Sequence, residues 1–124
     1  MSRSQIVLVL VAATAAIGVW LWLSPPRWWL NYMKPVDLTN PVSAGKSVIA
    51  KYTCRKCHLI GGEGQAKGPN LDGVTDRLDP ISLRLWLQDP RSIKWNTPMP
   101  NFQLSDPEIE AILSYLKELD HTSE

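Results

Sequence analysis

The stretch Cys54-Arg55-Lys56-Cys57-His58 decides how this sequence is interpreted. Its spacing, C-x-x-C-H, is typical of a segment that binds a haem covalently through two thioether bonds. Two thiols on one turn can each add to one vinyl group of the haem, and the histidine that follows can offer a neutral imidazole nitrogen to iron. We therefore predict thioether bonds at Cys54 and Cys57 and an axial iron ligand at His58.

Other uses of a C-x-x-C segment are a zinc site, a thiol-redox site and a disulfide. A structural zinc needs four ligands, whereas the sequence has two cysteines and two histidines, and His121 lies close to its C-terminal end. A thioredoxin-like site needs a βαβ context, and no such pattern is present. A disulfide between Cys54 and Cys57 would leave His58 without a role. Haem attachment accounts for all three residues of the motif.

A haem bound in this way has either a second axial ligand or an open iron site. Met99 lies well downstream, between Pro98 and Pro100, which remove two backbone donors and hold the chain extended. We predict that Met99 is the second ligand, because methionine opposite histidine raises the reduction potential of the iron. The alternative is a methionine that fills a gap in the core.

An apolar run of 18 residues at 6–23 precedes the motif and would form roughly 27 Å of helix, enough to cross a bilayer core. Arg3 precedes the run, which predicts a cytoplasmic N-terminus. The alternative is a cleaved signal peptide, but its apolar region is usually shorter, and Pro25-Pro26 does not suit a cleavage site. We predict a single transmembrane anchor over 1–24 that contacts lipid through 6–23.

The next segment, 25–40, is rich in tryptophan and proline. Part of it, 28–32, is expected to lie in the headgroup layer, and 34–39 is expected to be a short extended linker. Nearby aromatic side chains form the kind of belt that marks a membrane interface. These are Trp20, Trp22, Trp28 and Trp29. The segment therefore connects an anchor to a domain outside the bilayer.

Local signals mark three helices in 41–120. Asn40-Pro41 and Asp79-Pro80 each place a capping residue before a first-turn proline, and Ser105 to Glu108 forms a capping box. The first and last helices each carry one apolar face. These faces consist of Gly45, Val48, Ile49 and Tyr52, and of Ile109, Ile112, Leu113 and Leu116. No alternation is long enough to predict a strand, and 121–124 is predicted to be a frayed tail.

The charge of the chain excludes one class of partner. Its formal net charge is +1, and from residue 41 onward ten Lys or Arg stand against eleven Asp or Glu, so no global field favours nucleic acid. Four basic residues near the motif could steer an acidic protein partner, or could belong to an ordinary mixed-charge surface. They are Lys51, Arg55, Lys56 and Lys67.

Four pieces of the sequence occur in the order and spacing of one family. They are the C-x-x-C-H segment, then Lys67-Gly68-Pro69-Asn70-Leu71, Met99-Pro100-Asn101-Phe102 and Glu110-Ala111-Ile112-Leu113-Ser114-Tyr115-Leu116-Lys117. On these pieces, 41–120 resembles class I (monohaem) cytochrome c, and the anchor makes the chain similar to membrane-anchored bacterial members. The resemblance implies an all-α, cytochrome c-type domain around one covalent haem c, preceded by one transmembrane helix.

The resemblance also implies roles for particular residues. The carbonyl of Pro69 would accept a hydrogen bond from the ligand histidine, although composition alone favours an ordinary turn there. The methionine ligand would be Met99, and the first and last helices would cross beside the haem, with Gly45 against Tyr115. For Trp86, reasoning from the residues leaves two alternatives, a hydrogen bond to a haem propionate or a place in the core.

The function implied is that of an electron carrier rather than an enzyme. The haem domain is expected on the extracytoplasmic (periplasmic) side of the cell membrane, exchanging single electrons with redox proteins of a respiratory or photosynthetic chain. It would act either as a tethered shuttle swinging on 34–40 or as a fixed subunit of a membrane complex. The alternative from another class is a haem-based gas sensor, in which Met99 is displaceable.

Overall fold

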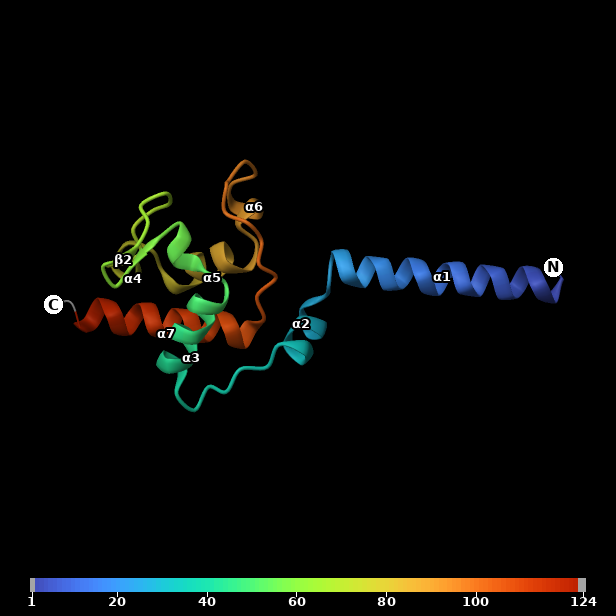
Figure 1. The fold of residues 1–124 in the computed structure, drawn as a ribbon, viewed down its shortest axis with the longest axis horizontal. Coiled ribbons are helices and arrows are strands. Elements are labelled where there is room, and N and C mark those ends of the chain that lie inside the picture. The colour runs from blue at the N-terminus through green and yellow to red at the C-terminus, as the bar shows by residue number, and fades with distance from the viewer. Residues whose placement is uncertain (1, 123–124) are drawn as a thin grey trace.

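The computed structural model describes residues 2–122, and a long N-terminal helix leads into a small helical domain (Figure 1). The elements in chain order are α1 (Arg3–Leu23), α2 (Arg27–Met33), α3 (Pro41–Lys51), the 3-10 turn η1 (Cys54–Lys56), β1 (Leu59–Ile60), β2 (Glu63–Gly64), α4 (Val74–Arg77), α5 (Pro80–Gln88), α6 (Pro90–Ile93) and α7 (Asp106–Thr122). The predicted helical class is confirmed.

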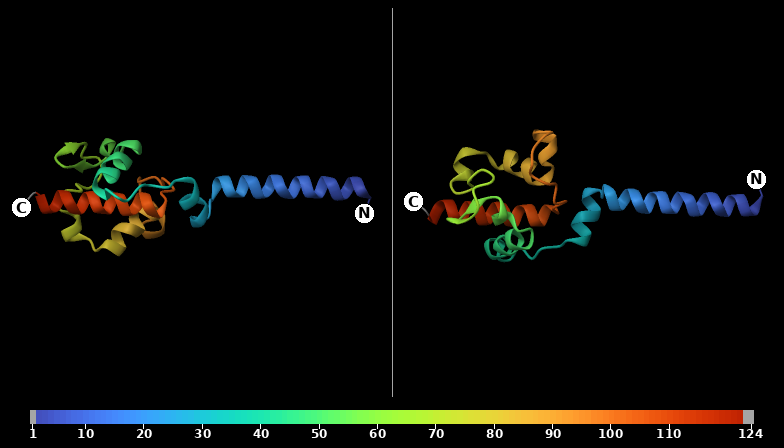
Figure 2. Two further views of the ribbon diagram at one scale, coloured as in Figure 1. Left: turned by 90° about the horizontal axis from the view of Figure 1, so that it is seen from below. Right: turned by 45° about the horizontal axis from the view of Figure 1, so that its top comes forward.

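Helix α1 projects away from the domain in every view (Figures 1 and 2). Its first turn is closed by a capping box between Ser2 and Gln5, and it ends at Leu23, just before Pro25 and Pro26. Among residues 2–122 it is the one helix long and apolar enough to cross a membrane, and none of its residues is buried in the protein. The predicted apolar run therefore forms a continuous helix whose apolar side chains are exposed, apart from the half-buried Leu21.

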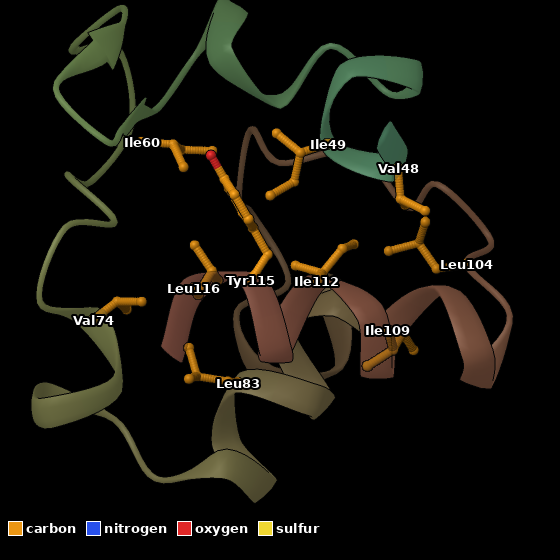
Figure 3. Packing of buried hydrophobic residues seen from close by; sticks show 10 residues of the cluster. All are labelled: Val48, Ile49, Ile60, Val74, Leu83, Leu104, Ile109, Ile112, Tyr115 and Leu116. Atoms are coloured by element: carbon orange, nitrogen blue, oxygen red, sulfur yellow. The ribbon is translucent and has the colours of Figure 1, made fainter. Parts of the chain in front are cut away.

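The domain is organised by the crossing of α3 and α7. Gly45 lies at the contact, and a Cβ atom there would stand 2.0 Å from the carbonyl oxygen of Ala111 and 2.7 Å from Cβ of Tyr115. Only a glycine lets the two backbones approach so closely. Ile49 and Ile112 are buried at the same interface, as Figure 3 shows. The predicted crossing of the first and last helices is confirmed.

Helix α7 separates α3 from α4 and α5, which cover its other side (Figure 2). Leu83 of α5 and Val74 of α4 point toward α7 and join the core (Figure 3). Asp120, near the end of α7, accepts hydrogen bonds from the backbone N–H groups of Gly73 and Thr75 at 2.7 and 2.9 Å. A single carboxylate thus holds the short helix α4 against the long one.

Several short elements differ from the sequence predictions. Residues 59–64 form a two-stranded antiparallel hairpin, turned by Gly61 and Gly62 at φ of 66° and 72°. Helices α4 and α6 were not predicted, because each has only four residues and no readable period. Helix α7 continues to Thr122, so the prediction of a frayed tail from His121 is wrong for 121–122, and 123–124 lie outside the described residues.

The segment that follows the anchor docks on the domain. Helix α2 buries Leu30 and pairs Arg27 with Asp106, the first residue of α7. Asn31 reaches the same residue twice: it donates to the Asp106 carboxylate at 2.6 Å and accepts from the Asp106 N–H at 2.8 Å. The exposed face of α2 carries Tyr32, with 76% of its surface accessible. The stalk (residues 25–34) is therefore attached to the start of α7.

Candidate haem attachment site

The C-x-x-C-H segment leaves α3 through an abrupt change of direction. Thr53 adopts a left-handed conformation (φ 54°), and η1 then brings both cysteines onto one turn. The N–H groups of Cys57 and His58 both donate to the carbonyl of Cys54, at 3.2 and 3.0 Å. Both cysteines are free thiols, Cys54 half-buried and Cys57 exposed. Burial raises the pKa of the Cys54 thiol, which keeps it protonated at neutral pH.

The ring of His58 is oriented by the loop that follows. Its Nδ1 atom lies 2.7 Å from the carbonyl oxygen of Pro69, the contact that the sequence resemblance implies. Because a carbonyl can only accept, Nδ1 carries the proton and Nε2 is left with a free lone pair. An imidazole held in this way is ready to bind a metal through Nε2.

Gly68 allows the loop to lie against the histidine. Its N–H donates to the carbonyl of Cys57 at 2.6 Å, and a Cβ atom at this position would stand only 2.7 Å from Cε1 of His58. The loop is held further by a backbone bond of 2.9 Å from Leu71 to Leu59. The requirement for glycine at 68 was not predicted, although the Gly68-Pro69 pair marks the segment as a turn.

These residues fit a covalently bound haem c. Two unpaired thiols lie on one turn, and next to them is an imidazole with one nitrogen committed to a carbonyl and the other free. Within 2–122, no group of three or more His, Cys, Asp or Glu side chains is placed to hold a bare metal ion. The two thiols and the imidazole suit a macrocycle that is attached through sulfur and takes one protein ligand from the attachment segment.

The other predicted site residues lie on α5 and on the segment that leads to α7. Met99 is half-buried, and its N–H donates to the hydroxyl of Thr97 at 3.3 Å. Trp86 is also half-buried, on α5, where both of its alternatives remain open. The role of Met99 as second ligand stays a prediction.

The basic residues near the motif divide into two groups. Lys51 pairs with Glu108 at 2.8 Å, and Arg55 donates to the hydroxyl of Tyr115 at 3.1 Å. Lys56 and Lys67 are exposed. Only the second group presents charge that a partner protein could reach without breaking an internal contact.

A buried carboxylate that the sequence identified only as a helix cap links α3 to α7. Glu108 is 1% exposed, completes the capping box with the N–H of Ser105 at 3.0 Å, and also accepts from Tyr52 and Lys51 at 2.9 and 2.8 Å. Burial acts to raise the pKa of Glu108, but these hydrogen bonds outweigh it and hold that pKa below its ordinary value. The carboxylate is therefore charged at neutral pH.

A model of the family described as Cytochrome c matches residues 42–120 of this chain. The match begins at the second residue of α3, ends two residues before the end of α7, and includes the attachment segment, the Pro69 loop and Met99. It excludes α1 and the stalk.

Three relatives extend the comparison. A nitric oxide reductase subunit of Paracoccus denitrificans is 35% identical over 95 residues, which cover 67% of this chain and 63% of that protein. The reductase subunit of the same name from Halomonas halodenitrificans is 30% identical over 104 residues, 74% of this chain and 69% of that protein. Cytochrome c oxidase subunit 2 of Alkalihalophilus pseudofirmus is 31% identical over 84 residues, 60% of this chain and 25% of that protein. The chain thus spans about a quarter of the oxidase subunit and roughly two thirds of the reductase subunits.

Proposed function

Since the chain belongs to the cytochrome c family, and its cofactor is therefore haem c, we propose that it carries single electrons between redox proteins at a membrane. When bound, the haem supplies a one-electron iron couple. The observation that carries the proposal is the C-x-x-C-H turn with its histidine ring fixed by the Pro69 carbonyl. This arrangement would hold the His58 ligand in one position in both oxidation states, which would keep the reorganisation energy of electron transfer small.

The residues that hold the cofactor follow from this arrangement. We propose that Cys54 and Cys57 form the thioether bonds and that His58 binds iron through Nε2. Met99 is proposed as the second axial ligand, presented by a segment stiffened with prolines on both sides. Trp86 is proposed to lie near the cofactor, because it is half-buried on α5.

A site with both axial positions filled by protein has no place for a substrate. We propose that this chain is not an enzyme by itself and works as a subunit, or as a tethered donor or acceptor, of a membrane oxidoreductase complex. The relatives support this proposal, because their names identify them as subunits of a nitric oxide reductase and of a cytochrome c oxidase. A respiratory or photosynthetic chain would supply and remove the electrons.

The proposed topology has one membrane span. Residues 1–24 would form the anchor, 25–40 the interfacial segment and linker, and 41–120 the haem domain. Arg3 before α1 favours an N-terminus in the cytoplasm, so the haem domain would lie on the extracytoplasmic side. The exposed tryptophans at the end of α1, Trp20 and Trp22, support an interface at that level.

Two measurements test the proposal. A pyridine haemochrome spectrum of the denatured, acid–acetone-extracted chain is expected to show haem c with two thioether bonds, and loss of all colour would contradict it. Carbon monoxide added to the reduced protein at neutral pH is expected to bind slowly and incompletely, because Met99 holds the sixth position. Rapid, complete binding would instead indicate a ligand-binding haem protein, the gas-sensor alternative.

A further inference from the structure

The segment between Met99 and α7 is held at three successive residues by groups from other parts of the chain. The ring of Phe102 packs against Tyr52, with 5.6 Å between the ring centroids. The carbonyl of Gln103 accepts a hydrogen bond from Nζ of Lys34 at 2.8 Å. The carbonyl of Leu104 accepts one from Arg27, also at 2.8 Å. This run of fixed residues begins three positions after Met99.

Two of these three contacts come from the stalk. Arg27 and Lys34 stand at the two ends of α2, directly after the membrane anchor. The contact is reciprocal, because the hydroxyl of Ser105 donates to the carbonyl of Lys34 at 2.7 Å. Both basic side chains are charged donors, which make stronger hydrogen bonds than neutral ones. We call Arg27 and Lys34 the stalk clamp.

The backbone at the clamped residues adopts a conformation that needs support. Gln103 has φ of 51°, in the left-handed region that residues with a side chain seldom occupy. Such a conformation persists where the surroundings over-determine it, and here the support comes from Lys34 and from the Asn101 side chain, which accepts from the Gln103 N–H at 2.8 Å. The direction in which the chain leaves Met99 depends on this turn.

Lys34 also contacts a residue that lies just before the attachment segment. Nζ of Lys34 lies 3.2 Å from the hydroxyl of Tyr52, which itself donates to Glu108. Tyr52 immediately precedes Thr53, the left-handed residue (φ 54°) from which the C-x-x-C-H turn departs. Thr53 and Gln103 are the two non-glycine residues with positive φ in 2–122. Lys34 bonds to the carbonyl of Gln103 and to the hydroxyl of Tyr52, the neighbour of Thr53.

We propose that Arg27 and Lys34 are positioning residues for Met99, so that the membrane stalk holds the methionine side of the haem site in register with the attachment side. The inference rests on the proposed role of Met99 as axial ligand. It assigns residues outside the region matched by the family model a part in the haem site, because that match begins at residue 42. Loosening the clamp would make the methionine easier to displace without removing it.

The test uses the full chain with its haem, in mild detergent. Lys34→Met removes the donor and keeps an unbranched side chain, and Lys46→Met makes the same change at an exposed position of α3. The first measurement is the affinity of added imidazole for the oxidised iron, which reports how readily the axial methionine leaves. The second is hydrogen exchange of the backbone amides of 101–105.

For Lys34→Met we expect imidazole to bind roughly tenfold more tightly and the amides to exchange roughly tenfold faster, the change that follows from losing one hydrogen bond from a charged donor. Lys34→Arg and Lys46→Met are expected to match the wild type. Arg27→Gln provides a second test of the clamp, with the same direction expected, if Lys34→Met does not fold.

Met99→Ala separates the two levels of the argument. If it strengthens imidazole binding while Lys34→Met and Arg27→Gln leave both measurements unchanged, the clamp is wrong and the proposed ligand stands. If Met99→Ala does not affect imidazole binding, Met99 is not the ligand, and the inference is overturned together with that part of the proposed function.

Discussion

Two regions of this domain carry the proposed haem ligands, the attachment side (residues 53–71) and the methionine side (residues 93–101), and they are held in place in different ways. Residues 53–71 have many contacts among themselves, including the His58–Pro69 contact, the hairpin and the backbone bond from Leu71 to Leu59, besides the bond from Arg55 to Tyr115 of α7. Residues 93–101 have few internal bonds and expose two large apolar side chains, Ile93 by 43% and Trp95 by 82%. Contacts to other parts of the chain hold the residues that follow Met99, at 102–104.

The comparison shows that one side of a cofactor site can be held mainly by contacts between residues near in sequence, and the other side by contacts between residues far apart in sequence. The bonds that orient His58 on the attachment side join residues at most 18 positions apart, from 53 to 71. The methionine side depends on Lys34, which lies 69 positions before its partner Gln103. A change in one region should therefore affect a different property from a change in the other.

The largest effect is expected from His58→Ala, which removes the centre of the attachment side. Without the imidazole the iron loses its ligand from the attachment segment, and the loop at 68–71 loses the ring on which it rests. We expect no stable protein with haem to accumulate, measured as haem stain retained on the polypeptide per amount of protein. Wild-type levels of haem would show that the two sides do not differ in the way described.

The next largest effect is expected from Met99→Ala, the matching change on the other side. The covalent haem should be retained, because the attachment segment does not depend on Met99. The reduction potential should fall by on the order of 0.1 V or more, within the roughly 0.8 V over which axial ligands move haem potentials. Redox titration measures the shift, and an unchanged potential and spectrum would exclude Met99 as the ligand.

Gly45→Ala tests the frame that both sides share. The added Cβ would stand 2.0 Å from the carbonyl oxygen of Ala111, so α3 and α7 must move apart. We expect the free energy of unfolding to fall by about 2–3 kcal/mol, although alanine alone favours a helix by up to about 1 kcal/mol. Denaturant titration measures the loss. Lys46→Ala, on the exposed face of the same helix, should change the stability by less than about 0.5 kcal/mol.

Glu108→Gln is expected to weaken the link between α3 and α7 in a pH-dependent manner. Because the pKa of Glu108 is lowered by folding from its ordinary value of 4.5, its charge stabilises the fold above that pH, and the contribution is lost as the pH falls through the folded pKa. We expect the variant to be less stable by about 1–2 kcal/mol at pH 7. The difference from wild type should shrink below about pH 4.5, and a difference independent of pH would contradict this account.

The smallest effect is expected from Trp95→Ala. This side chain is 82% exposed on the segment before Met99 and contributes little to the core. The free energy of unfolding should change by less than about 0.5 kcal/mol, as for other exposed positions. A loss of more than about 1 kcal/mol in the isolated chain would show that 93–101 is better packed than its exposure indicates.

What the sequence could predict follows the same division between near and distant contacts. The caps Asn40 and Asp79 and the box of Ser105 with Glu108 were predicted correctly, because each signal acts within four residues. The attachment motif was read from five adjacent residues. The Pro69 contact needed a family resemblance, since composition alone favoured an ordinary turn.

The features that were missed are formed by residues far apart. Arg27 and Asp106 are 79 positions apart, and nothing local to either one indicates the other. Asp120 accepts from the N–H of Thr75 at the start of α4, 45 positions earlier, and no local signal predicts this contact. The hairpin at 59–64 has only two residues in each strand, too few for an alternating pattern to be read.

The docking of α2 changes what the extended segment at 35–39 can do. The stalk before it and α3 after it both pack in the same folded domain, so this segment is a loop within the domain and not a flexible tether between the anchor and the domain. Extra residues there would cost only a fraction of a kcal/mol in loop entropy and would not extend the range of the domain above the bilayer. That range is set by the three residues between α1 and α2, Ser24 to Pro26. A connection this short keeps the domain close to the end of α1, whatever the length of the segment at 35–39.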